Sequence, residues 1–144
     1  MGLVAVQHSV LFSIICMGAA ATTYAYGSDH LQKYKQIKAM VAIQPMRYLD
    51  FVKALGLPGF VQKWVNNENS KRVGFDIPAK SFKEDVQKIP VPTLLVQNDQ
   101  DEYLNRESIE EYYDSLNVEK EMLWLADIGK KRAAAYDYLT KNPE

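Results

Sequence analysis

Residues 10–20 read Val-Leu-Phe-Ser-Ile-Ile-Cys-Met-Gly-Ala-Ala, and they carry the clearest structural signal in the sequence. The part from Val10 to Ile15 is almost continuously apolar and has the length of a strand buried on both faces. The part from Ala19 to Tyr26 is rich in small residues, which suit a helix packed closely on a sheet. The stretch therefore predicts a strand, a sharp turn at Cys16 and a helix.

Further strands are predicted by apolar runs at Ile37–Ile43, Val91–Gln97 and Glu121–Ala126. Between them, helices are predicted most clearly over Arg106–Leu116, where apolar residues recur at helical spacing and Asn105 can cap the first turn. Strands that alternate with helices are typical of parallel sheets. We therefore expect an α/β protein with three α/β/α layers and a mainly parallel sheet of about four strands.

The length of 144 residues predicts a single domain over residues 1–144. Residues 44–89, between the second and third predicted strands, differ in character from the rest. Scattered apolar residues indicate short helices there, Asn66–Lys71 reads as a polar loop, and Ser81–Lys88 reads as a helix that leads into the third strand. We interpret residues 44–89 as a lid-like insertion.

The composition excludes several classes of protein. Because 17 basic and 18 acidic residues give a net charge of −1, no overall field would hold nucleic acid or an acidic membrane. Cys16 is the only cysteine, and His8 and His30 are poorly spaced for a metal, so internal disulfides and common zinc sites are excluded. There is no glycine-rich phosphate loop. We expect neither a metal nor a cofactor, and a lone cysteine fits the reducing cytoplasm.

The apolar stretch Val10–Ala25 also has features of a signal peptide, including small residues near its end. No Lys or Arg occurs before Lys33, so the positive segment that such a peptide needs is not seen. The stretch is too short and too polar to cross a bilayer. A small exported protein remains an alternative to the buried strand.

Three segments together resemble the α/β-hydrolases, in particular dienelactone-hydrolase-like proteins and acyl hydrolases. They are Ile15–Ala20, Ile37–Pro45 and Val91–Asp101, and their order and spacing extend the resemblance over nearly the whole chain. The resemblance implies that the chain forms the C-terminal half of that fold, with four strands side by side. It also implies activity on esters or thioesters.

The resemblance assigns roles to individual residues. Cys16 takes the place of the nucleophile, and the backbone N–H of Met17 takes that of one oxyanion donor. Asp101 takes the place of the acid that orients the base, with Asp99 as the alternative. Read without the resemblance, Cys16 is a small buried apolar residue and Asp101 a turn residue.

Three departures from the family pattern lower the expected activity. Ile14 stands where the pattern has its first glycine. The expected histidine near Gly129 is absent, and Lys130 can stabilise a thiolate but cannot shuttle a proton while it is charged. Only nine residues precede Val10, so the family's second oxyanion donor is not seen, and losing such a donor costs about 100- to 1000-fold in rate. The basic run 130–132 otherwise reads as a solvated helix start.

We therefore expect an ester or thioester hydrolase that acts through Cys16 on a small acyl substrate and is weak or inactive. The alternative is a non-catalytic binding or assembly module that keeps the fold. In both cases the first strand would form an exposed sheet edge, which predicts a partner. That partner would be a second copy of the chain, a separate chain that supplies the N-terminal half, or the rest of a longer protein of which this chain is a fragment. Neither nucleic acid nor a membrane is expected.

Overall fold

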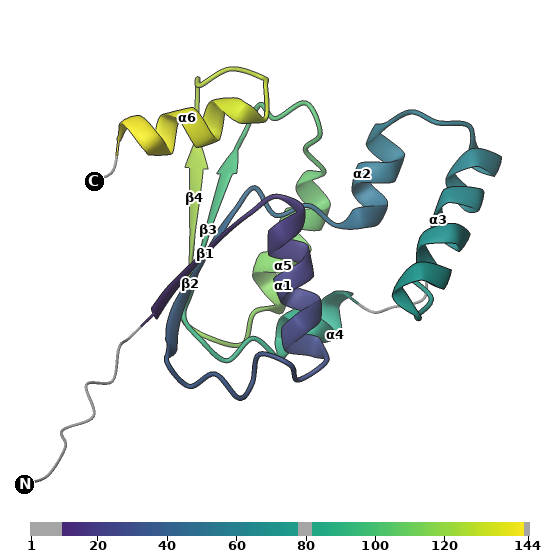
Figure 1. Cartoon of the computed structure of the whole chain (residues 1–144). Helices are drawn as coiled ribbons and strands as arrows, with labels where there is room; N and C mark the ends of the chain where they lie inside the picture. Colours follow the sequence, from purple (N-terminus) through teal and green to yellow (C-terminus); the bar gives the residue numbers. More distant parts are fainter. Residues whose placement is uncertain (1–9, 78–81, 143–144) are drawn as a thin grey trace, which may run out of the picture.

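The computed structural model describes residues 10–77 and 82–142 of the chain. In chain order the elements are β1 (Val10–Ile15), α1 (Met17–Gly27), β2 (Ile37–Ile43), α2 (Tyr48–Ala54), α3 (Gly59–Val73), α4 (Phe82–Gln87), β3 (Thr93–Asn98), α5 (Arg106–Ser115), β4 (Lys120–Leu125) and α6 (Ala133–Lys141) (Figure 1). The strand, turn and helix predicted around Cys16 are confirmed, because β1 ends directly before this residue and α1 begins directly after it.

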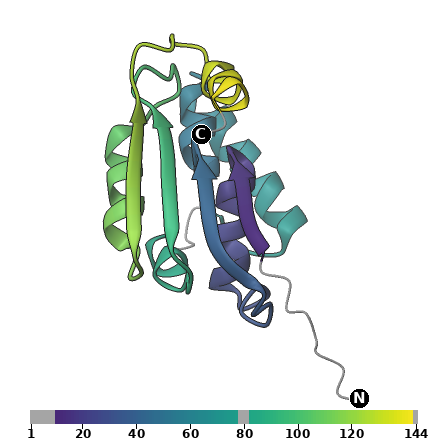
Figure 2. The same ribbon diagram turned by 90° about the vertical axis from the view of Figure 1, so that its left-hand side faces the viewer.

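The strands form one sheet of four parallel strands in the order β1-β2-β3-β4. Ile15 pairs with Ile43, and Ile43 pairs in turn with Val96. Because every strand runs in the same direction, all four carboxyl ends lie at one edge of the sheet (Figure 2). The predicted α/β class and parallel sheet are therefore confirmed, and the turn at Cys16 lies at this edge.

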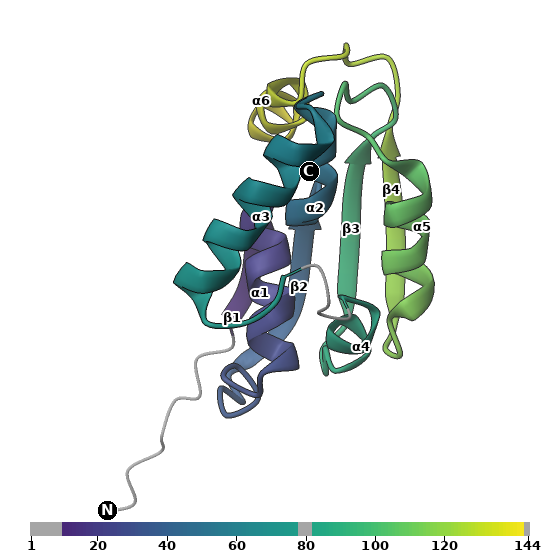
Figure 3. The ribbon, with the colours of Figure 1, turned by 90° about the vertical axis from the view of Figure 1, so that its right-hand side faces the viewer.

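Helices cover both faces of the sheet, which gives the three predicted layers. On one face, α1, α4 and α5 surround a core that includes Ile14, Met40, Leu95 and Tyr112 (Figure 3). On the other face, Ala135 of α6 packs against a cluster of strand residues that includes Val96. This helix covers only the carboxyl end of that face (Figure 2).

Helix α5 follows the sequence prediction closely. The Asn105 side chain accepts a hydrogen bond from Ser108 N at 3.3 Å and so caps the first turn. Ile109 and Tyr112 are buried on one face of the helix, against the sheet. The apolar residues whose spacing predicts the helix are thus the ones that pack it against the sheet.

The region predicted as a lid divides into two parts. Helices α2 and α3 stand beside the three layers, and no residue of α3 is buried (Figure 1). Helix α4, in contrast, packs against α1 and α5 and belongs to the layer on that face. The polar loop predicted at Asn66–Lys71 is wrong, because these residues continue α3 to Val73, where Gly74 ends the helix with a φ of 78°.

Part of the sheet is exposed. β1 is an edge strand of the described sheet, and Leu11 and Ile15 on it are 64% and 47% exposed. Leu123 of β4, on the same face as α6, is 43% exposed. Apolar side chains therefore extend across the face that α6 leaves bare. Among the described residues, no helix has both the length and the apolar character needed to cross a membrane.

Candidate active site

Cys16 occupies a strained turn between β1 and α1. Its φ of 56° and ψ of −124° lie in a region that residues with a side chain rarely adopt. The turn is held by Cys16 N, which donates to Ile43 O at 2.9 Å, and by Cys16 O, which accepts from Ala19 N at 3.1 Å. This conformation leaves the thiol partly exposed at the carboxyl edge of the sheet, beside the N-terminus of α1.

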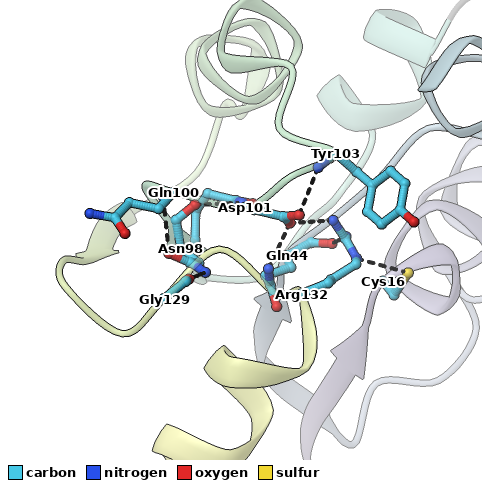
Figure 4. A network of polar contacts seen from close by, with 9 residues as sticks. Cys16, Gln44, Asn98, Gln100, Asp101, Tyr103, Gly129 and Arg132 are labelled. Atoms are coloured by element: carbon cyan, nitrogen blue, oxygen red, sulfur yellow. Dashed lines mark hydrogen bonds and ion pairs between the residues drawn. The ribbon is translucent and has the colours of Figure 1, made fainter.

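Arg132, directly before α6, joins Cys16 to Asp101 (Figure 4). Its Nε donates to Cys16 Sγ at 3.3 Å, while Nη1 donates to Asp101 Oδ2 and Nη2 donates to the backbone carbonyl of Gln44. The Asp101 carboxylate is fully buried and also accepts from Gln44 Nε2 at 2.7 Å and from Tyr103 N at 2.9 Å. The guanidinium therefore lies between the thiol and a buried anion.

Two loops at the carboxyl edge of the sheet hold this arrangement together. Asn98 Nδ2 donates to Gly129 O at 2.8 Å, and Glu102 N donates to Lys130 O at 3.0 Å. These bonds tie the loop after β3, which carries Asp101, to the loop after β4, which leads into Arg132. The position of the guanidinium is therefore fixed by backbone contacts as well as by its own charge.

The residues predicted from the sequence are found as follows. Cys16 and Asp101 are brought to the same site, where Arg132 contacts both of them. Met17 is the first residue of α1, so its N–H is among the amides that have no partner inside the helix. Lys130 is exposed, and the cation that contacts Cys16 is Arg132, two residues further along the chain.

Asp99, the alternative acid, lies outside this network. Its backbone N–H donates to Leu125 O at 3.1 Å, and its buried Oδ1 has no partner in the described part of the chain. Sequence reasoning missed Gln44 altogether and interpreted Arg132 as part of a solvated helix start. The only signal for Arg132 in the sequence is its place shortly after the last strand, where the family has its histidine.

Tyr136 on α6 also borders the thiol. Burial raises the pKa of its hydroxyl, the positive charge of Arg132 opposes this rise, and the negative charge of a Cys16 thiolate adds to it. The hydroxyl oxygen is buried and makes no hydrogen bond within residues 10–77 and 82–142. Tyr136 therefore stays protonated, and its hydroxyl lies within hydrogen-bonding reach of Cys16 and Arg132.

A small cavity lies on the other side of Arg132, between α2 and α5. Arg132, Gln97 and Tyr103 line it together with Ile109 and Tyr112. Its volume of about 20 Å³ is enough for a single water molecule. An acyl group does not fit in this cavity.

Taken together, these groups can stabilise negative charge but cannot accept a proton. The guanidinium of Arg132 has only donors and no acceptor, and Asp101 already accepts from three donors. The N-terminus of α1 adds partial positive charge beside Cys16. Within the described residues, no cluster of three His, Cys, Asp or Glu side chains can hold a metal ion. The arrangement suits an anionic sulfur nucleophile without a general base.

Comparisons with known proteins agree with the fold. No protein-family model matches the chain, and no curated protein matches it in sequence. The solved structure of Est1E from Butyrivibrio proteoclasticus superposes with a TM-score of 0.61 at 15% identity, covering 94% of this chain and 62% of that one. Acetyl xylan esterase 1 from Thermoanaerobacterium sp. JW/SL YS485 gives a TM-score of 0.59 at 12% identity, covering 95% of this chain and 45% of that one.

A thioesterase domain from the curacin biosynthetic pathway gives a TM-score of 0.53 at 11% identity and covers 96% of this chain and 66% of that one. At these identities the likeness establishes the fold and not the activity. The chain spans about half of the length of the first solved esterases that it matches. This chain therefore has the α/β-hydrolase fold.

Proposed function

We propose that this chain is an α/β-hydrolase-like protein whose Cys16 accepts an acyl group from an activated ester or thioester and releases it only slowly. The observation that carries the proposal is Arg132, which contacts Cys16 Sγ at 3.3 Å and is itself held by Asp101. A cationic donor in this place can hold a negatively charged sulfur, and the thiolate is the nucleophilic form of cysteine. The same donor cannot serve as a base.

Acylation needs no base once the sulfur is ionised. The sulfur lone pair forms a bond to the carbonyl carbon, and the carbonyl π electrons move to the oxygen. When the tetrahedral intermediate collapses, the carbonyl re-forms and the leaving group departs with the electrons of the broken bond. The N–H of Met17 can donate to the oxyanion, since it has no partner inside α1.

Deacylation is different, because the attacking water must lose a proton. A positioned base typically contributes about 100- to 10,000-fold to such a step. Arg132 occupies the space next to the sulfur, and a guanidinium does not accept protons. The acylated form of Cys16 is therefore expected to accumulate.

The same reasoning selects the leaving group. Aryl oxides and thiolates depart as anions without a proton, whereas an alkoxide needs one. The hydroxyl of Tyr136 lies close to Cys16, but burial keeps its pKa high, so it is a weak acid for a departing alkoxide. We therefore expect reaction with thioesters and aryl esters and little reaction with alkyl esters.

The test is intact-mass spectrometry after incubation with p-nitrophenyl acetate, and separately with a small acetyl thioester. We expect one acetyl group per chain, and peptide mapping should locate it on Cys16, the only cysteine of the chain. Cys16→Ala should remain unmodified. Ser13→Ala is the matched control, because Ser13 offers an exposed hydroxyl on β1 close in sequence to Cys16, and this variant should be acetylated normally.

The alternative of a non-catalytic binding or assembly module makes the opposite prediction. In that case wild type and Cys16→Ala would both remain unmodified. The exposed edge and apolar face of β1 favour a partner under either reading, as a second copy of the chain or a chain that completes the sheet. The cytoplasm keeps free thiols reduced, which suits a chain that acts through its single cysteine, so we propose a cytoplasmic location.

A further inference from the structure

We propose that the hydroxyl of Tyr136 donates a hydrogen bond to the oxyanion that forms when Cys16 is acylated. This inference rests on the proposed function, since it concerns the same reaction. It assigns the second oxyanion donor to α6, at the far end of the chain from Cys16.

The fold brings Tyr136 to the thiol by two routes. Tyr136 lies four residues after Arg132, so both side chains project from the same side of the start of α6. The Tyr136 ring also packs against the cluster that contains Ile43. Because the carbonyl of Ile43 accepts a hydrogen bond from Cys16 N at 2.9 Å, the ring and the thiol meet at the end of the same strand pair.

The hydroxyl of Tyr136 is buried and has no partner in the described part of the chain. Buried hydroxyl groups are usually hydrogen-bonded, so an unpartnered one beside a nucleophile calls for an explanation. Burial raises its pKa, and a negative charge on Cys16 raises it further. The group therefore keeps its proton and can donate to a second anion that forms next to the sulfur.

The other donors near the sulfur are already committed. Arg132 uses Nε for Cys16 Sγ, Nη1 for Asp101 and Nη2 for the carbonyl of Gln44. Met17 supplies one backbone amide, and an oxyanion site usually contains a second donor. During the reaction the Tyr136 proton stays on its oxygen. The hydrogen bond forms as the carbonyl oxygen gains charge and weakens when the carbonyl re-forms.

The experiment compares two reactions of the same sulfur in wild type and in Tyr136→Phe. Acylation by p-nitrophenyl acetate passes through an oxyanion, whereas alkylation by iodoacetamide is a displacement at carbon that forms none. We expect the acylation rate constant to fall roughly 100-fold in Tyr136→Phe. The alkylation rate constant should stay within about twofold, because the thiolate keeps its contact with Arg132.

Tyr138→Phe is the matched control, because Tyr138 is 41% exposed on the same helix and should not affect either reaction. Equal loss of both reactions in Tyr136→Phe would overturn the inference, since the hydroxyl would then act on the thiolate. Unchanged acylation would overturn it as well and would leave the proposed function intact. Wild-type protein that is alkylated but never acylated would overturn the proposed function, and the inference with it.

Discussion

Replacing Arg132 with methionine removes the cation between Cys16 and Asp101. The Asp101 side chain is 0% exposed and that of Arg132 only 13%, so the ion pair is almost completely shielded from water. Removing one partner of such a pair typically costs about 3–5 kcal/mol, because the other charge stays buried. Asp101 would keep the donors Gln44 Nε2 and Tyr103 N. We therefore expect Arg132→Met to lower the free energy of unfolding by about 3 kcal/mol.

The complementary variant Asp101→Asn keeps the shape of the side chain and removes its charge. The guanidinium would retain the carbonyl of Gln44 as a partner, so we expect a smaller loss of about 2 kcal/mol. The double variant leaves neither charge buried alone. Its loss should be smaller than the sum of the two single losses by at least about 1 kcal/mol.

Urea unfolding followed by circular dichroism measures all three values. Lys130→Met is the matched control, because Lys130 is an exposed cation two residues from Arg132, and its loss should be within about 0.5 kcal/mol of zero. The loss of unfolding free energy in the double variant could instead equal the sum of the two single losses to within about 0.5 kcal/mol. That result would refute the ion pair as the link between the two loops.

Gly27, Tyr112 and Leu11 test other parts of the fold. Gly27→Ala places a Cβ 1.7 Å from Asp85 Oδ1 and should lower the free energy of unfolding by about 1–3 kcal/mol in the same urea titration. Gly18→Ala is its control, because a Cβ there meets nothing within 4 Å and should be neutral or slightly stabilising. Burial raises the pKa of Tyr112 from 10.0 to about 12. Because the folded state holds this proton more tightly, the free energy of unfolding should fall as the pH rises from 10.0 to about 12, and in Tyr112→Phe this part of the pH dependence should be lost. Leu11, 64% exposed on the edge strand, should take part in self-association, so Leu11→Lys should lower the mass measured by sedimentation; wild type that is monomeric at high concentration would contradict this.

The strands, the turn at Cys16 and helix α5 could be predicted because their signals are local. A run of apolar residues such as Val10–Ile15 is typical of a buried strand wherever its neighbours lie. Helix α3 was only partly anticipated, because an unburied helix carries no apolar stripe to mark its length. Its second half, Asn66–Lys71, has the composition of a loop, yet it is helical and includes an ion pair between Lys71 and Glu68 at 2.7 Å.

The site was predicted less completely, because its decisive contact is not local. Cys16 and Arg132 are separated by 116 positions, and no pattern near either residue indicates the other. Lys130 is the closer match to the expected histidine by position along the chain. Lys130 is instead held by its backbone, because its carbonyl accepts a hydrogen bond from Glu102 N. Arg132, directly before α6, is the residue that contacts the sulfur. Only the folded loops reveal this choice.

The lifetime of the acyl group on Cys16 shows whether the folded site contains a general base. Acetylated protein is prepared with p-nitrophenyl acetate, and loss of the acetyl group is followed by intact mass in the folded protein and in the same protein unfolded in urea. If Arg132 stands where a base would be needed, the folded protein should release the group no faster than the unfolded chain does. Release that is about 100-fold or more faster in the folded protein would contradict the account, because it would require a working general base at the site.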